Sequence, residues 1–367
     1  MADTRSMLET NDDVAAWLDQ VIADKSVRVV VFNVALADFN GIIGDVPSGK
    51  HAERLKTAEG EARMTLTPAD KLIGRIRRER KDIFVVGFKT TTGATPDEQY
   101  AKALALLKKN SLNLVLANYT VTRHNLIAAP EETRYCSTHD RDEVLSFLSK
   151  MVVSRMQNRF TRSTVVPGEA VPWRSEAVPD NLREVVDFCI GKGAYKPVLG
   201  KTAGHFAVKA SEGDILTSIR KSNFNELEQV GLVRVQSRND DEVIAHGHRP
   251  SVGGQSQRII FREHPELDCI VHFHCPVKDE APLKAHIPVK PQWPNECGSH
   301  ECGQNTSRGL QRIDLGDGDE LSVVYLDDHG PNIVFSRKTP ADKVKAFIDA
   351  NFALSSKTGG LAATLAH

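Results

Sequence analysis

The chain has 367 residues, of which 40% are hydrophobic and 26% charged, and its formal net charge is −1 at pH 7. This length exceeds an ordinary single domain and predicts two. The nearly neutral charge excludes a global field that would attract nucleic acid or an anionic membrane. The sequence has no apolar run of the roughly 20 residues that a membrane span needs, and its polar N-terminus has no signal-peptide core, so we expect a cytoplasmic protein. Its six cysteines are then expected to be thiols or metal ligands.

The first half alternates predicted strands with predicted helices. Continuous β-branched runs are typical of strands buried on both faces, and apolar residues at helical spacing indicate the helices. The predicted strands are 27–36, 82–88 and 112–118, and the predicted helices are 12–22, 68–80, 96–109 and 141–157. This alternation predicts a Rossmann-like, parallel, doubly wound sheet.

The second half has shorter strand signals flanked by helices, which predicts a mixed, mostly antiparallel sheet within an α/β fold. A stretch with three prolines and no clear period separates the halves, and we expect it to be a linker. The polar, glycine-containing end of the chain is expected to be a frayed tail. The predicted divisions are 1–159, the linker 160–180, 181–356 and the tail 357–367.

Three predicted strand ends and one predicted helix start carry distinctive sequences. They are 35–39 (ALADF), 85–92 (VVGFKTTT), 114–118 (LVLAN) and 66–70 (LTPAD). In order and spacing they resemble the phosphopantothenoylcysteine synthetase family, over roughly residues 8–155. The resemblance implies a CTP or ATP site at which a carboxylate is activated as an acyl-nucleotide before cysteine attacks it. The family's glycine-rich opening segment, with its catalytic Asn, does not occur in this sequence, which implies an incomplete domain or one that a partner chain completes.

The resemblance places the nucleotide at the carboxyl ends of the strands, where open α/β sheets bind ligands. Phe88 could stack on a base, Lys89 could neutralise phosphate, and Asn118 could hydrogen-bond base or ribose. The alternative is that these residues only finish strands in an inherited scaffold. The full predicted set is Ala37, Asp38, Lys56, Phe88, Lys89 and Asn118.

A His-Phe-His sequence ends the apolar predicted strand 268–274. Because side chains alternate along a strand, His272 and His274 point to one face and Phe273 to the other. Neutral imidazoles are ligands for zinc and related transition ions. The pattern therefore predicts two ligands of one divalent metal, and the alternative is a pair of packed core histidines.

Segments 265–274 and 325–330 (YLDDHG) resemble class II aldolase/adducin-like domains, which have an α/β/α fold. The resemblance implies His329 as the third ligand, with an open coordination position at which zinc would act as a Lewis acid. A competing structural zinc site would use Cys275, Cys297, His300 and Cys302.

The sequence departs from this family at the residue that transfers protons. The family's Glu, 19 residues before the first His of the pair, is replaced by Gly253, so no catalytic residue is assigned. His205, Asp328 and Glu301 are unranked candidates for a base. The positions matching the family's phosphate site predict an anion or substrate site at Gly204, His205, Arg220, Lys221 and Ser251.

Three hypotheses of function follow. The first is a metal-dependent enzyme with lyase, epimerase or dehydratase chemistry on a small phosphorylated or carboxylated substrate, joined to a nucleotide-binding domain. The second is an ATP- or CTP-dependent carboxylate–amine ligase completed by a partner chain. The third is a non-catalytic, adducin-like binding or scaffold protein. Retention of the three histidines favours the first, and both resemblances imply a homo-oligomer.

Overall fold

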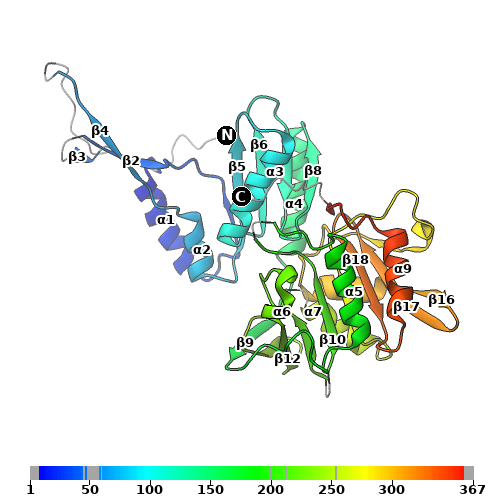
Figure 1. Ribbon diagram of the computed structural model, residues 1–367. Helices are drawn as coiled ribbons and strands as arrows, with labels where there is room; N and C mark the ends of the chain where they lie inside the picture. The colour runs from blue at the N-terminus through cyan, green and yellow to red at the C-terminus, as the bar shows by residue number, and fades with distance from the viewer. Residues whose placement is uncertain are drawn as a thin grey trace.

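The structure, a computed structural model, contains two α/β domains that follow one another along the chain (Figure 1). The N-terminal domain is built on a five-stranded sheet and the C-terminal domain on a ten-stranded sheet. In the part of the chain that the structure describes, no helix is long and apolar enough to cross a bilayer. The described residues are 8–43, 46–47, 58, 60–198, 200–210, 213–252 and 254–358.

The N-terminal sheet is parallel where the sequence predicts its strands and antiparallel beyond them. Its order is β1-β5-β6-β7-β8, with β1, β5 and β6 parallel and the last two strands antiparallel. The two antiparallel strands escaped prediction because they are short and joined by tight turns. The strands are β1 (Val29–Phe32), β5 (Phe84–Thr91), β6 (Leu114–Tyr119), β7 (Asn125–Ala128) and β8 (Arg134–Thr138).

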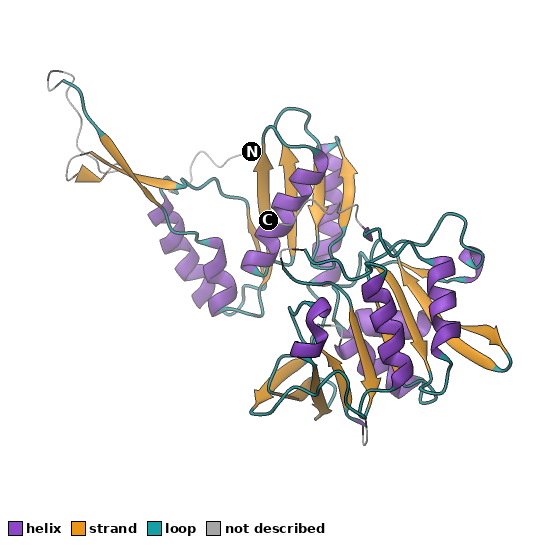
Figure 2. Cartoon of the chain, viewed as in Figure 1, coloured by secondary structure: helices purple, strands orange, loops and turns teal. Residues whose placement is uncertain are grey.

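Helices cover both faces of this sheet, which makes a three-layer α/β/α sandwich (Figure 2). Three helices pack on one face, and the fourth packs on the other. The prediction that the first strand is buried on both faces is wrong, because β1 lies at the sheet edge and Val31 is 54% exposed. The helices are α1 (Asn11–Ala23), α2 (Ile73–Glu79), α3 (Pro96–Asn110) and α4 (Arg141–Arg155).

A separate three-stranded sheet of β2 (Phe39–Ile43), β3 (Val46–Pro47) and β4 (Met64–Pro68) extends away from this domain (Figure 1). The helix predicted to start at Pro68 begins instead at Ile73. Backbone pairing of β4 with β2 extends through Pro68, so tertiary pairing overrode the local helix-start signal. Lys56, predicted at the nucleotide site, lies outside the described residues.

The C-terminal sheet has the predicted mostly antiparallel character. Its order is β15-β17-β18-β14-β10-β11-β12-β13-β9, with β16 paired to β17, and only the β13–β9 and β15–β17 pairs are parallel. The strands are β9 (Arg162–Val166), β10 (His205–Lys209), β11 (Ile215–Ser218), β12 (Leu232–Ser237), β13 (Glu242–His246), β14 (Cys269–His272), β15 (Val289–Lys290), β16 (Gln311–Gly316), β17 (Asp319–Leu326) and β18 (Gly330–Phe335).

Helices α5 (Asp180–Gly191) and α9 (Ala341–Asn351) pack on one face of this sheet. Helix α7 (Gly254–Glu263) packs on the other face, with α8 (His300–Gly309) against it. A short helix, α6 (Leu227–Val230), precedes β12. The C-terminal domain is therefore also a three-layer α/β/α structure.

The segment 160–180 is more ordered than the predicted linker. Its first residues form β9, which adds a parallel strand to β13 of the C-terminal sheet. Trp173 is buried and its ring packs edge-on against Phe206, with ring centroids 5.5 Å apart. These contacts attach the segment to the C-terminal domain.

The two domains share a buried interface. Val198 packs into the core of the N-terminal domain, and the Trp293 ring lies 5.5 Å from that of Phe147 on α4. The guanidinium of Arg155, at the end of α4, donates to the Glu131 carboxylate and to the Trp293 carbonyl oxygen at 2.8 Å. The ion pair lies within the N-terminal domain, and the hydrogen bond to Trp293 ties it to the C-terminal domain.

Glu296 lies at the same interface and should make stability depend on pH. Asn113 Nδ2 donates to its Oε2 at 2.8 Å, and burial raises the pKa of Glu296 to about 7. A carboxyl whose folded-state pKa is raised contributes stability that is complete below its unfolded pKa and is lost as the pH rises through the folded one. Glu296→Gln keeps an acceptor oxygen without the charge. We expect it to raise the Tm, relative to the parent, more at about pH 8 than at about pH 5.

Differential scanning calorimetry at both pH values measures this effect. Glu280→Gln is the matched control, because Glu280 is exposed, and its effect on the Tm should be the same at both pH values. Equal Tm shifts for Glu296→Gln at the two pH values would contradict the assignment.

Candidate metal centre

His272 and His274 lie on the same face of the C-terminal sheet, at the end of β14. Ile270, two residues before His272, packs on the α7 face, and Phe273 packs on the other face against Tyr195 and Phe352. The predicted alternation therefore places both imidazoles on the α7 side.

His329 reaches them from the turn between β17 and β18. Asp328 has φ 56° and Gly330 has φ 135°, so the backbone reverses sharply around the histidine. A Cβ on Gly330 would lie 2.1 Å from the Phe273 carbonyl oxygen. Only glycine permits this approach of the turn to β14, and the approach delivers His329 to the pair.

The three histidines form one buried cluster. The His329 ring centroid lies 4.6 Å from that of His272 and 4.6 Å from that of His274. One ring nitrogen from each lies within 4.8 Å of the others. Among the described residues, no other group of three or more His, Cys, Asp or Glu side chains is gathered in this way.

Hydrogen bonds fix the proton positions on two of the rings. His272 Nδ1 donates to the Pro331 carbonyl oxygen at 2.8 Å, and His329 Nδ1 donates to Gln292 Oε1 at 3.2 Å. The Gln292 amide orientation is set by its Nε2, which donates to the Asn295 carbonyl oxygen. With the protons on Nδ1, the Nε2 atoms of His272 and His329 present lone pairs to each other at 3.2 Å.

Two facing lone pairs repel unless a cation lies between them. Tetrahedral zinc, with Zn–N bonds of about 2.0–2.1 Å, separates its nitrogen ligands by about 3.3 Å. The observed 3.2 Å between the two Nε2 atoms fits that separation. The cluster therefore has the geometry and the proton positions of a nitrogen ligand set.

The third histidine has an unsatisfied atom. His274 Nδ1 is buried and has no hydrogen-bond partner among the described residues, which is rare for a buried polar atom. Burial lowers the pKa of His272 to about 4 and those of His274 and His329 well below the usual range. All three are thus held neutral, the state in which imidazole binds a metal.

The predicted frayed tail contributes to the cluster instead. Thr358 is buried; its N–H donates to the His274 carbonyl oxygen and its hydroxyl to the His329 carbonyl oxygen, both at 3.1 Å. Lys357 Nζ donates to the Ala194 carbonyl oxygen at 3.2 Å. Thr358 thus connects the backbones of His274 and His329, and no local sequence pattern predicted this role. Residues 359–367 lie outside the described residues.

The predicted anion site lies beside the cluster. His205 on β10 is paired with His272, and their ring centroids are 4.8 Å apart. Gln257 Nε2 donates to His205 Nδ1 at 2.8 Å. Gly204 has φ 105°, and a Cβ there would lie 2.5 Å from the His272 carbonyl oxygen. Arg220, Lys221 and Ser251 lie on neighbouring loops.

The candidates for a base differ in their surroundings. Glu301, in the first turn of α8, accepts through Oε2 from the Arg159 N–H at 2.9 Å, so its carboxylate faces the segment between α4 and β9. Burial and then repulsion from Asp327 raise the pKa of Asp328. Gly253, at the position of the family's Glu, lies outside the described residues.

The competing thiolate site is not assembled. Cys275 packs in the core with α5 and α9, on the face opposite the histidines, and its Sγ lies 3.6 Å from the Leu354 carbonyl oxygen. Cys302 lies in α8, and its Sγ contacts Gln292. Alternation along the chain and the formation of α8 separate these thiols.

The predicted nucleotide residues divide between the two faces of the N-terminal sheet. Phe88 packs on the α4 face. Asn118 Oδ1 accepts from the Thr90 hydroxyl at 3.2 Å. Lys89 lies near Asp38, which forms an ion pair with Lys71. Ala37 exchanges two hydrogen bonds with the Asn11 side chain, at 3.1 and 2.9 Å.

The first comparison with known proteins concerns the C-terminal domain. Residues 194–278 match the family model described as the Class II Aldolase and Adducin N-terminal domain. The C-terminal domain is class II aldolase-like. The matched residues of this aldolase-like domain include two of the clustered histidines.

Similar proteins fall into two groups. The coenzyme A biosynthesis bifunctional protein CoaBC of Thermococcus kodakarensis is 27% identical over 112 residues, which cover 30% of this chain and 26% of that protein, and the N-terminal region resembles it. YgbL of Escherichia coli is 19% identical; the match covers 47% of this chain and 84% of the YgbL chain, with a TM-score of 0.34. The DNA/pantothenate metabolism flavoprotein of Streptococcus pneumoniae is 16% identical, covering 39% and 70%, with a TM-score of 0.32.

Gly330 provides a test of the close approach. We expect Gly330→Ala to lower the free energy of unfolding by about 3 kcal/mol or more, because the Cβ collides with the backbone of β14. Gly316→Ala is the control, since Gly316 also has a positive φ, 81°, but open space around its Cβ, and should cost about 1 kcal/mol. Urea unfolding measures both, and equal losses would refute the packing argument.

Proposed function

We propose that the chain is a zinc-dependent enzyme of the class II aldolase type, acting on a small phosphorylated or carboxylated substrate. The observation that carries this proposal is the pair of unprotonated Nε2 atoms of His272 and His329, which face each other at 3.2 Å. The family match over 194–278 supports the same conclusion independently.

Each side chain would have a defined task. His272, His274 and His329 would hold the ion, and it would supply a Lewis acid that polarises a substrate carbonyl. Gln292 and the Pro331 carbonyl group orient two of the rings by accepting hydrogen bonds from their Nδ1–H groups. Lyase, epimerase and dehydratase chemistry all begin from such a polarised carbonyl.

A non-catalytic scaffold is the less favourable alternative. Burying polar atoms without partners costs free energy, and His274 Nδ1 would remain unsatisfied among the described residues. A protein that needs the fold only for binding gains nothing from two opposed nitrogen lone pairs. The cluster therefore favours an occupied metal site.

We expect the purified chain to bind about one zinc ion and His274→Ala and His329→Ala to bind none. At a zinc concentration 100 times the Kd, bound metal should stabilise the parent by about 2.7 kcal/mol, whereas the variants should gain no stability. Metal analysis and thermal unfolding with and without a chelator measure the two effects.

His286→Ala is the matched control, because His286 is exposed and is not part of the cluster, and it should behave like the parent. Similar chelator-treated Tm values for parent and variants would show that the variants are folded. Zinc binding that survives in both cluster variants would sink the proposal.

The N-terminal domain supports a second, separate candidate function. We propose that it binds CTP or ATP through Lys89 and Asn118, as the similarity to CoaBC suggests. These residues lie at the carboxyl ends of β5 and β6, where such sheets bind ligands. In isothermal titration, Lys89→Ala should weaken CTP or ATP binding about tenfold, since it removes a charged phosphate partner. Unchanged affinity, or no affinity in the parent, would refute this assignment.

A further inference from the structure

We infer that the anion site beside the histidine cluster takes a substrate with two or more phosphate groups, held by cations of the C-terminal domain beside the domain interface. The inference deepens the proposed function and rests on it for the identity of the reacting site. The cations are Lys201, Arg220, Lys221 and Arg249, and Lys108 of the N-terminal domain lies near them in an ion pair with Glu132.

Backbone hydrogen bonds bring the loops of the C-terminal domain together. The Thr202 N–H donates to the Ser222 carbonyl oxygen at 3.2 Å, and the Arg220 N–H donates to the Arg249 carbonyl oxygen at 2.9 Å. These two contacts align three loops, which carry Lys201, the Arg220–Lys221 pair and Arg249.

The N-terminal domain brings Lys108 to the same place. Val198 packs into its core, and the Lys201 N–H donates to the Val198 carbonyl oxygen, so Lys201 follows directly on the interface. Lys108, near the end of α3, forms an ion pair with buried Glu132. The next residue, Thr133, donates to the Asp328 carbonyl oxygen, immediately before His329.

The four cations of the C-terminal domain lack counter-ions. Among the described residues, no carboxylate lies within ion-pair distance of Lys201, Arg220, Lys221 or Arg249. Desolvation and then repulsion from Arg220, Lys201, Lys108 and Arg249 lower the pKa of Lys221, as expected for a cation surrounded by like charges. Repulsion from Arg249 also contributes to the lowered pKa of Arg220.

Charge balance then selects the ligand class. Glu132 neutralises Lys108, which leaves about four positive charges. A phosphate group carries about −1.5 to −2 near neutral pH, so one phosphate matches about half of them and two match them all. A substrate with two phosphates fits the site, and a monophosphate leaves cations repelling each other.

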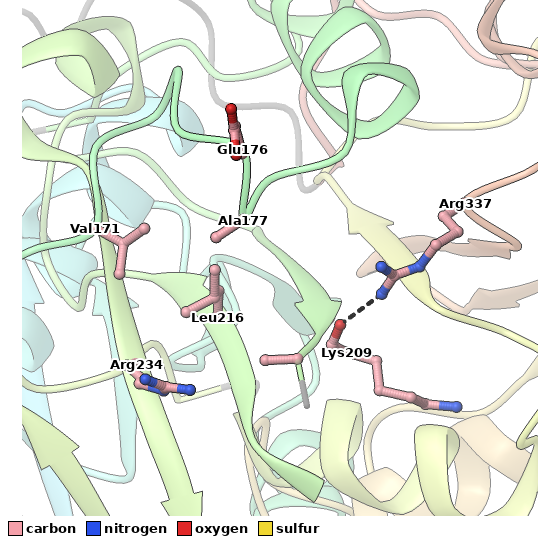
Figure 3. Close-up of a pocket in the computed structure, with 8 residues that line it drawn as sticks. Val171, Glu176, Ala177, Lys209, Leu216, Arg234 and Arg337 are labelled. Carbon is pink, nitrogen blue, oxygen red and sulfur yellow. Dashed lines mark hydrogen bonds between the residues drawn. The ribbon is translucent and has the colours of Figure 1, made fainter. Parts of the chain in front are cut away.

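A cavity at the other end of the sheet shows the contrast. It has a volume of about 470 Å³ and is lined by Leu216, Lys209, Arg234 and Arg337, among others (Figure 3). Arg234 is ion-paired with Asp214 and Arg337 with Asp268, while Lys209 Nζ donates to a backbone carbonyl oxygen. Because the cations of this cavity already have partners, it is a less favourable place for an anion than the site around Lys221.

Isothermal titration of the full, zinc-loaded chain with bisphosphoglycerate and with monophosphoglycerate tests the inference. The two probes share a carboxylate and differ by one phosphate. We expect the parent to bind the bisphosphate about tenfold or more tightly than the monophosphate. Lys201→Ala combined with Lys221→Ala should abolish this preference without lowering the zinc content or the Tm.

Two further variants make the design specific. Lys109→Ala removes a neighbouring exposed charge of α3 and should keep the preference. Lys108→Met combined with Glu132→Gln removes an ion pair that carries no net charge, and should therefore keep the preference.

The outcomes separate this inference from the proposed function. Equal binding of the two probes, no binding of either, or a preference that survives in the Lys201/Lys221 variant overturns the inference, whatever the zinc content. A preference that persists in protein unable to bind zinc supports the anion site and overturns only the metal-dependent function.

Discussion

The opposed Nε2 atoms of His272 and His329 impose the central constraint on the C-terminal domain. To bring them within 3.2 Å, β14 must end beside the β17–β18 turn, and Gly330 must pass too close to β14 for any Cβ. Hydrogen bonds to the Pro331 carbonyl oxygen and to Gln292 Oε1 then keep the ring protons of His272 and His329 on Nδ1, away from the facing Nε2 atoms. Together these features hold two nitrogen lone pairs at a distance where they repel each other, and a bound cation would replace that repulsion with attraction.

The N-terminal domain is part of the structure that supports this cluster. Arg155 and Glu131 form a buried pair that holds the backbone around Trp293, next to Gln292. Thr133 contacts the residue before His329. A change on either side of this interface can therefore alter the position of a histidine ring. Fusion of the two domains in one chain thus lets the N-terminal domain support the histidine cluster.

The same interface separates the two candidate sites. Asn113, just before β6, contacts Glu296, so the C-terminal domain docks at the amino ends of the parallel strands (Figure 1). Lys89 and Asn118 lie at the carboxyl ends. Asn118 follows Asn113 by five positions along the strand, a distance of about 17 Å. Within one chain, a small substrate could not contact both sites, which favours two distinct binding functions.

The sequence by itself determined the α/β class of both domains, the central strands of each sheet and the shared face of His272 and His274, whereas His329 entered only through a family resemblance. These follow from local rules: β-branched runs form buried strands, and alternation puts His272 and His274 on one face. Tertiary structure decided the rest, because the deciding contacts join residues far apart in the chain. Pairing with β2 extended β4 through Pro68, and the thiols of Cys275 and Cys302 were placed on different sides of the sheet. Contacts between loops that are far apart in the sequence gave roles to Gln292, Thr358 and the cations around Lys221. No spacing in the sequence predicts such contacts.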